Sequence, residues 1–428
     1  METGGHTPGG TALFFFLLLS VVMAAAHYYI WKRVVRDTTR PGRGRLVGTV
    51  AVVFLLLLVV GALGLQRVGG FGRVVAWPGF LWLAGVFYLT VLLGLLEIPR
   101  LVLLRRARRG RVPVTAGAPG TTPGATPDTA GDAEEVPPDP APRAPEVDEG
   151  RRLFLARSLA VAGGVATAGI VTYGATQALG DPVVKRVPVT LGKLDPRLSG
   201  YRIAVVSDIH LGPLLGRSHT ERIVRMINEQ QVDLVAIVGD LVDGSVEELG
   251  EAAAPLRDLV STHGSFFVTG NHEYYSGAEQ WIAEVERLGV NALRNERLTI
   301  ERAGATFDLA GVNDVNGASF DDAPDFARAL DGRDPGTPVV LLAHQPVQVR
   351  EAARHGVDLQ LSGHTHGGQM FPFHLAVGLQ QPVRSGLETI DGTQVYTSNG
   401  AGFWGPPVRV GAPPDISVVE LRHNFAGR

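Results

Sequence analysis

Residues 202–210 read Arg-Ile-Ala-Val-Val-Ser-Asp-Ile-His, a short apolar run that ends in a carboxylate and an imidazole. Continuous apolar runs of this length are typical of strands that are buried on both faces of a sheet. In α/β sheets, functional side chains gather just outside the carboxyl ends of such strands. The run therefore predicts a buried strand that delivers Asp208 and His210 to a site.

The same pattern occurs twice more in the following residues. Val-Asp-Leu-Val-Ala-Ile-Val, beginning at residue 232, leads through a glycine to Asp240. Ser-Phe-Phe-Val-Thr, beginning at residue 265, leads through a glycine to Asn271 and His272. Glycine at such a strand end allows a tight turn and a close approach of the backbone. We therefore expect three neighbouring strands whose ends converge.

Two later segments complete the pattern. Val-Val-Leu-Leu-Ala, residues 339–343, reaches His344, and Val-Asp-Leu-Gln-Leu-Ser-Gly, residues 357–363, reaches His364 and His366. Carboxylate, amide oxygen and imidazole are ligands for Mn, Fe, Zn or Mg, and one carboxylate can bridge two cations. The chain has no cysteine, so thiolate ligands and disulfides are excluded. A metal site with oxygen and nitrogen ligands is predicted.

Each motif alone is a common turn or surface pair, but their ordered combination is specific. The blocks are Asp208-x-His210, Gly239-Asp240-x-x-Asp243, Gly270-Asn271-His272-Glu273, His344 and Gly363-His364-Thr365-His366. Together they resemble the signature of the calcineurin-like metallophosphoesterase superfamily over residues 181–428. The resemblance implies an α/β fold in the form of a four-layer αββα sandwich, and two divalent cations, Mn, Fe or Zn, as cofactors.

The resemblance also implies roles for individual residues. It assigns Asp208, His210 and His366 to one metal, Asn271, His344 and His364 to the other, and Asp240 to both. His272 is expected beside the scissile phosphate as the catalytic residue, because a positioned imidazole can stabilise phosphoryl oxygens or protonate the leaving group. Asp243 and Glu273 are expected to make structural hydrogen bonds. The block from Gly402 to Pro414 resembles that of bacterial membrane-associated or exported members.

The first 111 residues read as a membrane region. Thr11–Trp31, Leu46–Leu65 and Val74–Ile98 are apolar stretches close to the roughly 20 residues that cross a bilayer. Ser158–Leu179 is a fourth, less hydrophobic stretch that is rich in Ala and Gly. We expect three transmembrane helices and a fourth hydrophobic helix within residues 151–180.

Basic residues flank the first and third stretches, and only two lie in the turn after the second. The positive-inside rule then places the N-terminus outside, the basic loops in the cytoplasm and the domain after the fourth helix outside. Residues 112–150, rich in Pro, Gly and acidic residues, are expected to be a disordered linker. Gly150-Arg-Arg-Leu-Phe-Leu155 resembles a twin-arginine export signal, although it could equally be a basic anchor for the fourth helix.

These features predict a multi-pass membrane protein whose extracytoplasmic domain uses metal-activated water to hydrolyse a phosphodiester or pyrophosphate bond of a cell-envelope or lipid-linked substrate. Broad phosphomonoesterase activity and a non-catalytic metal-binding sensor are the alternatives. The predicted spans offer no ion pathway to favour a transporter, since Glu97 near one end is their single charged interior residue. Residues 181–428 carry 21 basic and 31 acidic groups, so no nucleic acid partner is expected.

Overall fold

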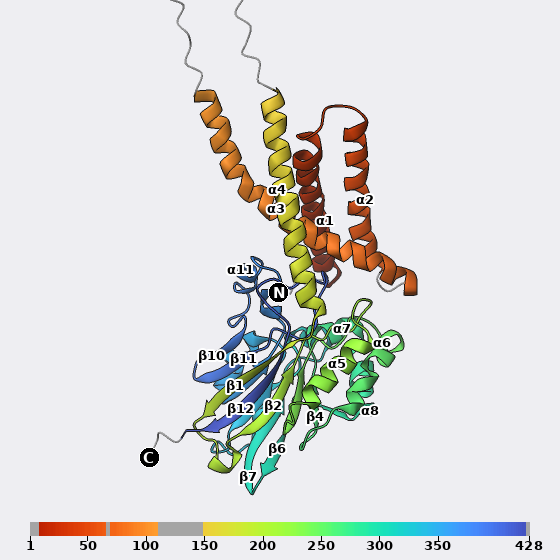
Figure 1. Ribbon diagram of the computed structural model, residues 1–428. Coiled ribbons are helices and arrows are strands. Elements are labelled where there is room, and N and C mark those ends of the chain that lie inside the picture. The colour runs from red at the N-terminus through yellow and green to blue at the C-terminus, as the bar shows by residue number, and fades with distance from the viewer. Residues whose placement is uncertain (1–7, 66–68, 110–148, 425–428) are drawn as a thin grey trace, which may run out of the picture. The chain divides into compact units, whose positions relative to one another are not determined.

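The computed structural model describes residues 8–65, 69–109 and 149–424 (Figure 1). The chain divides into two compact units, formed by residues 1–54 with 86–167 and by residues 55–85 with 168–428. The predicted linker, residues 112–150, lies outside the described residues except for its last two.

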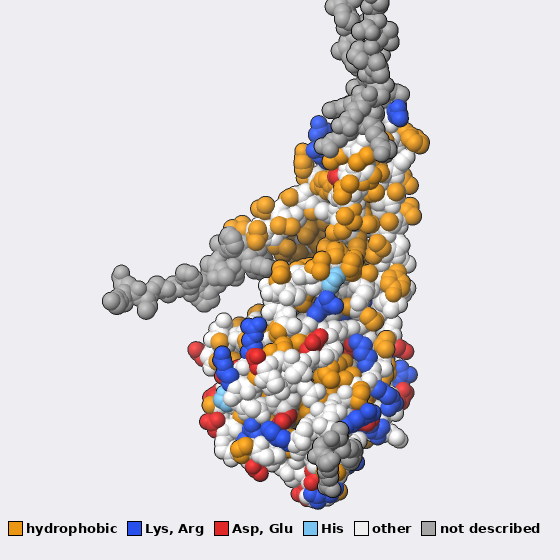
Figure 2. Space-filling view, turned by 90° about the vertical axis from the view of Figure 1, so that its left-hand side faces the viewer, with side chains coloured by type: hydrophobic (Ala, Val, Ile, Leu, Met, Phe, Trp, Pro, Cys, Tyr) orange, Lys and Arg blue, Asp and Glu red, His pale blue; other side chains and the backbone are white. Residues whose placement is uncertain are grey.

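Four long helices account for the apolar N-terminal part. They are α1 (Pro8–Ile30), which continues as a π-helical segment (Trp31–Arg36), α2 (Arg43–Leu65), α3 (Gly69–Arg109) and α4 (Glu149–Leu179). Within the described residues, Arg43–Gly64, Gly72–Val102 and Gly150–Leu179 are long and apolar enough to cross a membrane. The predicted first crossing forms a helix but is not among these three, so it stays a prediction. Figure 2 shows hydrophobic side chains over most of the visible helical region and mixed charges over the α/β region.

Glu97, the acidic residue inside the predicted third span, is neutralised within its own unit. Its carboxylate lies 2.7 Å from Nε of Arg33 and 2.9 Å from Nη1 of Arg100. Arg33 also contacts Asp37 at 2.8 Å. Charges in membrane helices are stabilised by such pairing, so this cluster ties the segment after α1 to α3.

The strands that precede the metallophosphoesterase-like motifs belong to two six-stranded sheets. The first has the order β1 (Val183–Leu191), β12 (Asp415–His423), β2 (Tyr201–Val206), β3 (Leu234–Val238), β4 (Ser265–Val268) and β5 (Val290–Ala292). The second has the order β10 (Gly386–Ile390), β11 (Thr393–Thr397), β9 (Leu359–Ser362), β8 (Val339–Leu342), β7 (Ala305–Gly311) and β6 (Glu296–Arg302). β2, β3 and β4 run parallel to one another, as do β7, β8 and β9. The five predicted site strands are confirmed as strands.

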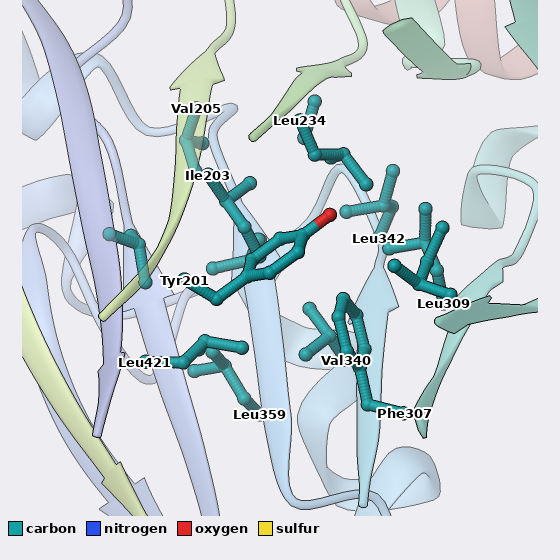
Figure 3. Close-up of a cluster of buried hydrophobic side chains, with 14 of the residues drawn as sticks. Tyr201, Ile203, Val205, Leu234, Phe307, Leu309, Val340, Leu342, Leu359 and Leu421 are labelled. Carbon is teal, nitrogen blue, oxygen red and sulfur yellow. The ribbon is translucent and has the colours of Figure 1, made fainter. Parts of the chain in front are cut away.

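The two sheets pack face to face through alternate side chains of their strands. On β2, Tyr201, Ile203 and Val205 belong to the core between the sheets, where they meet residues such as Phe307 and Leu359 (Figure 3). Each of these side chains is fully or almost fully buried. The period of two along a strand sends every second side chain to this core and the intervening ones to the outer face.

Helices cover the outer face of each sheet. Ala204 and Val206 of β2 pack in a cluster with residues of α5 (Arg217–Asn228), α6 (Val246–Ala253) and α8 (Ala278–Arg287). A separate cluster joins β7 and β8 to α9 (Phe326–Leu330) and α10 (Val349–Arg354). Two short helices, α7 (Asn271–Ser276) and α11 (His374–Val377), follow site strands. The predicted α/β fold with four αββα layers is therefore confirmed.

Candidate metal centre

The structure brings the predicted metal-site residues together from both sheets. Asp208 and His210 follow β2, Asp240 follows β3, and Asn271 opens α7 after β4. His344 follows β8, and His364 and His366 follow β9. Because the strands of each set are parallel, their carboxyl ends lie at one edge of the sandwich.

Ligand atoms from these residues form two close groups that share the side chain of Asp240 as a neighbour. In the first group, Nε2 of His366 lies 3.0 Å from Nε2 of His210 and 3.5 Å from Oδ1 of Asp208. In the second, Nε2 of His344 lies 3.2 Å from Oδ2 of Asp240 and 3.2 Å from Nδ1 of His364. Oδ2 of Asp240 is also 3.9 Å from Nε2 of His210. The two groups therefore meet at one carboxylate.

Asn271 supplies a direct test of whether these residues fit a metal ion. Its side-chain oxygen Oδ1 is buried and has no hydrogen-bond partner among the described residues. A buried amide oxygen without a partner is costly, and a cation would satisfy it. Oxygen and imidazole donors that converge in this way are the set that divalent transition metals prefer.

The protonation of His364, His366 and Asp240 suits metal binding, whereas burial raises the pKa of Asp208, and Asp240 outweighs burial to hold the pKa of His344 well above its usual value. Burial lowers the pKa of His364 to about 3 and holds that of His366 well below its usual value, so both rings stay neutral. Burial raises the pKa of Asp240, but nearby imidazoles, His344 foremost, outweigh it and hold that pKa well below the usual value. Neutral imidazole and charged carboxylate are the forms that coordinate metals.

Five of the candidate ligands adopt a left-handed backbone that favours glycine. The φ angles are 51° at Asp208, 50° at His210, 53° at Asp240, 69° at His364 and 51° at His366. Such conformations cost of order 1–3 kcal/mol each and cluster at functional sites. The surrounding fold therefore stabilises a strained arrangement that points these side chains into one space.

Gly239 shows why the turn before Asp240 lacks a side chain. Its φ is +85°, and a Cβ atom there would lie 2.6 Å from Nδ1 of His344. That imidazole nitrogen lies 2.8 Å from the carbonyl oxygen of Val238. The glycine therefore allows the backbone after β3 to approach and orient the His344 ring.

His272, the predicted catalytic residue, lies beside the donor groups and is partly exposed. Its backbone N–H donates to Oδ1 of Asp240 at 2.9 Å, and its Nδ1 lies 2.6 Å from Oδ1 of Asp243. Burial opposes protonation of the ring, but Asp240 and Asp243 outweigh it and raise the pKa of His272 to about 9. The ring contacts two exposed aromatic side chains, with centroids 5.7 Å from Tyr275 and 5.8 Å from Trp404.

Glu273 has the structural role that its position indicates. Its carboxylate accepts hydrogen bonds from the backbone N–H groups of Gly270 at 2.6 Å, Leu241 at 2.8 Å and Asp240 at 3.0 Å. These bonds link the turns after β3 and β4. Burial and Asp240 raise the pKa of Glu273 to about 7.

Arg409 is a site residue that the sequence analysis did not identify. It is 1% exposed, donates to the carbonyl oxygen of His366 at 2.8 Å, and places Nη2 3.1 Å from Nδ1 of that ring. Burial lowers the pKa of its guanidinium to about 10. The Gly-x-x-Gly-x-Pro-x-Arg block contains Arg409, but nothing in that pattern indicates that the arginine turns inward.

Comparison with known proteins agrees with this geometry. A family model described as calcineurin-like phosphoesterase matches residues 201–368. The chain is 41% identical over 274 residues to a metallophosphoesterase of Helicobacter pylori strain J99, covering 63% of this chain and 72% of that protein. It is 39% identical over 289 residues to a transmembrane protein with metallophosphoesterase domain from Bos taurus, covering 64% of each chain. It is 33% identical over 243 residues to a metallophosphoesterase of Aquifex aeolicus, covering 56% of this chain and 91% of that protein.

Proposed function

This chain belongs to the calcineurin-like metallophosphoesterases, a family of metal-dependent phosphoester hydrolases, and from that premise we propose that it is a membrane-anchored, two-metal enzyme that cleaves phosphodiester or pyrophosphate bonds. The observation that carries the proposal is the meeting of two donor groups at the Asp240 carboxylate. One carboxylate between two sets of imidazole donors is the arrangement that a binuclear centre requires.

The proposed ligand sets are Asp208, His210 and His366 for one ion, Asn271, His344 and His364 for the other, with Asp240 shared. Such ions supply positive charge for the phosphoryl oxygens and lower the pKa of water enough to make a nucleophile near neutral pH. His272 forms a third group of close donor atoms with His210 and Asp240, but in this proposal it acts on the substrate and is not a ligand. Asp243 lies next to Nδ1 of the His272 ring and orients it. The His272 side chain is 17% exposed, so the imidazole can reach substrate and protonate the leaving group.

We further propose that the chain is organised as a membrane region (1–111), a linker (112–150), a fourth helix with the twin-arginine-like motif (151–180) and the catalytic domain (181–428). Only residues 180–182 separate α4 from β1. The basic residues beside the first and third apolar stretches support an orientation with the catalytic domain outside the cytoplasm.

The membrane tether supports an envelope or lipid-linked phosphoester as substrate, because it raises the local concentration of membrane-bound molecules. The test uses the full chain, purified in detergent and loaded with manganese, against monoesters, diesters and lipid pyrophosphates. We expect turnover with a preference for diesters or pyrophosphates. A clear preference for soluble monoesters would contradict the proposed substrate class, and bound metal without any turnover would favour the sensor.

A further inference from the structure

The segment after the candidate metal loop carries a concentration of exposed apolar side chains. Phe371, Phe373, Leu375 and Leu379 are 57%, 52%, 67% and 87% exposed. Residues 370–383 contain no Asp, Glu, Lys or Arg. We call residues 370–379 the apolar loop. Contiguous exposed apolar surface on a folded domain marks a site of interaction with a protein or a membrane.

The base of the apolar loop is fixed, so its exposure belongs to the folded domain. The hydroxyl of Thr365 donates to the carbonyl oxygen of Arg384 at 2.6 Å, which closes the loop. Val383 is buried with Val349 and Val395. Above this base, the His374 ring stacks on Phe371 with centroids 4.9 Å apart. The loop is therefore a compact excursion that presents its apolar side chains outward.

Backbone hydrogen bonds connect the apolar loop to a candidate membrane span. The N–H of Phe371 donates to the carbonyl oxygen of Val410 at 2.9 Å. The N–H of the neighbouring Arg409 donates to the carbonyl oxygen of Gly174 at 2.9 Å. Gly174 lies in α4, near the end of the span Gly150–Leu179, and all four residues belong to one compact unit.

The loop after His210 makes a second connection of the same kind within that unit. Leu214 packs against Ala62 and Phe80, which lie in the candidate spans of α2 and α3. It also packs in the cluster of Ala178 and Phe403, which lie at the end of α4 and in the block beside Trp404. Two segments that follow candidate ligands, one after His210 and one after His366, are thus connected to apolar helices.

We propose that the apolar loop docks into the surface of the lipid bilayer and so holds the metal centre where it meets the phosphate groups of membrane lipids. The bilayer is the occupant because the loop lacks charge and is hydrogen-bonded, through one intervening segment, to a helix that is itself apolar enough to span the membrane. Aromatic and aliphatic side chains bind this interface by burying apolar area among the headgroups. The cleavage of membrane phosphoesters at the metal centre rests on the proposed function, whereas the docking of the apolar loop does not.

The absence of cysteine allows a direct test of the docking. Leu375→Cys and Leu379→Cys are each labelled with an environment-sensitive fluorophore in the full chain, reconstituted in phosphatidylglycerol nanodiscs. Val260→Cys is the matched control, because Val260 is 66% exposed and precedes the amino end of β4, opposite the site. We expect blue-shifted emission and quenching by spin-labelled acyl chains at 375 and 379, and neither effect at 260.

Two results would overturn the docking. Labels at 375 and 379 that behave like the label at 260 would show that the loop stays in water. A blue shift without quenching by lipid, which disappears when each disc holds one chain, would show that a second copy covers the loop.

A matched pair of substrates then separates docking from chemistry. Hexadecyl 4-nitrophenyl phosphate enters the bilayer, ethyl 4-nitrophenyl phosphate stays in water, and both release the same phenolate. In the Leu375→Glu/Leu379→Glu variant we expect about a tenfold or greater loss on the hexadecyl ester and unchanged turnover of the ethyl ester. Equal losses on both esters would contradict a docking role. Failure of the unaltered chain to cleave either ester would contradict the diester part of the proposed function and leave the fluorescence result to decide the docking.

Discussion

Oδ1 of Asp243 lies 2.6 Å from Nδ1 of His272, and the same oxygen lies 3.0 Å from Nδ1 of His210. One carboxylate therefore orients two rings of the centre, a proposed ligand and the proposed catalytic residue. In both rings it leaves Nε2 as the nitrogen available for the metal or the substrate.

Asp243→Asn tests this shared orientation. The amide oxygen can still accept hydrogen bonds from both rings but lacks the charge that strengthens them, so we expect kcat/KM for a diester to fall by about 10- to 100-fold. Metal titrations of the variant should also show weaker binding, through His210. Unchanged kinetics and metal affinity would show that Asp243 does not orient the two rings.

Gly239→Ala tests the close approach behind the centre. The new Cβ would lie 2.6 Å from Nδ1 of His344, at a φ of +85°. Gly289→Ala is the matched control, because its φ is +86° and a Cβ there meets nothing within 4 Å. Both variants pay about 1–2 kcal/mol for the left-handed backbone, which thermal unfolding measures. We expect only Gly239→Ala to lose metal and activity. Equal activity in the two variants would show that the close approach of residue 239 to His344 is not required.

His219 gives a pH dependence away from the metal centre. It is buried on α5, and burial together with Arg222 lowers its pKa to about 3. Because the folded pKa lies below the unfolded value, the folded state binds fewer protons, and stability is lost as pH falls from about 6.5 toward 3. The cost is about 2 kcal/mol at pH 5 for this one group.

The measurement compares His219→Gln with the unaltered chain by thermal unfolding in chelator at pH 7.5, 6 and 5. The chelator removes any bound metal beforehand, so that dissociation of metal at low pH does not contribute to the change in Tm. The variant should lose less Tm on acidification than the unaltered chain, and parallel losses would contradict the assignment.

The site was predictable because its signal is local. Each site strand is a short apolar run that a candidate ligand follows within three residues, as Asp208 follows Val206, and parallel pairing brings such ends together. The αββα layers followed from the family resemblance that these blocks carry.

The remaining features depend on contacts that no local pattern encodes. β12 pairs with β1 in parallel and with β2 in antiparallel register, more than 200 residues away in sequence. Arg409 reads as one more surface arginine, and its burial against His366 depends on the path of the chain after Trp404. The exposure of the apolar loop is likewise a tertiary property, since Phe371 and Leu375 would suit a core equally well.

The central claim is that one set of residues binds the metal and that His272 acts on the substrate without being a metal ligand. Asp240→Asn removes the shared charge between the two donor groups, whereas His272→Ala removes a ring that lies beside them. General acid catalysis by a positioned imidazole contributes about 10²- to 10⁴-fold. The two substitutions should therefore separate metal binding from turnover.

The most direct measurement is the metal content and diester turnover of these two variants beside the unaltered chain, all purified in detergent. The account predicts that the unaltered chain binds two ions, that Asp240→Asn loses metal and activity together, and that His272→Ala keeps its metal while turnover falls. Full metal content and unchanged turnover in both variants would contradict it.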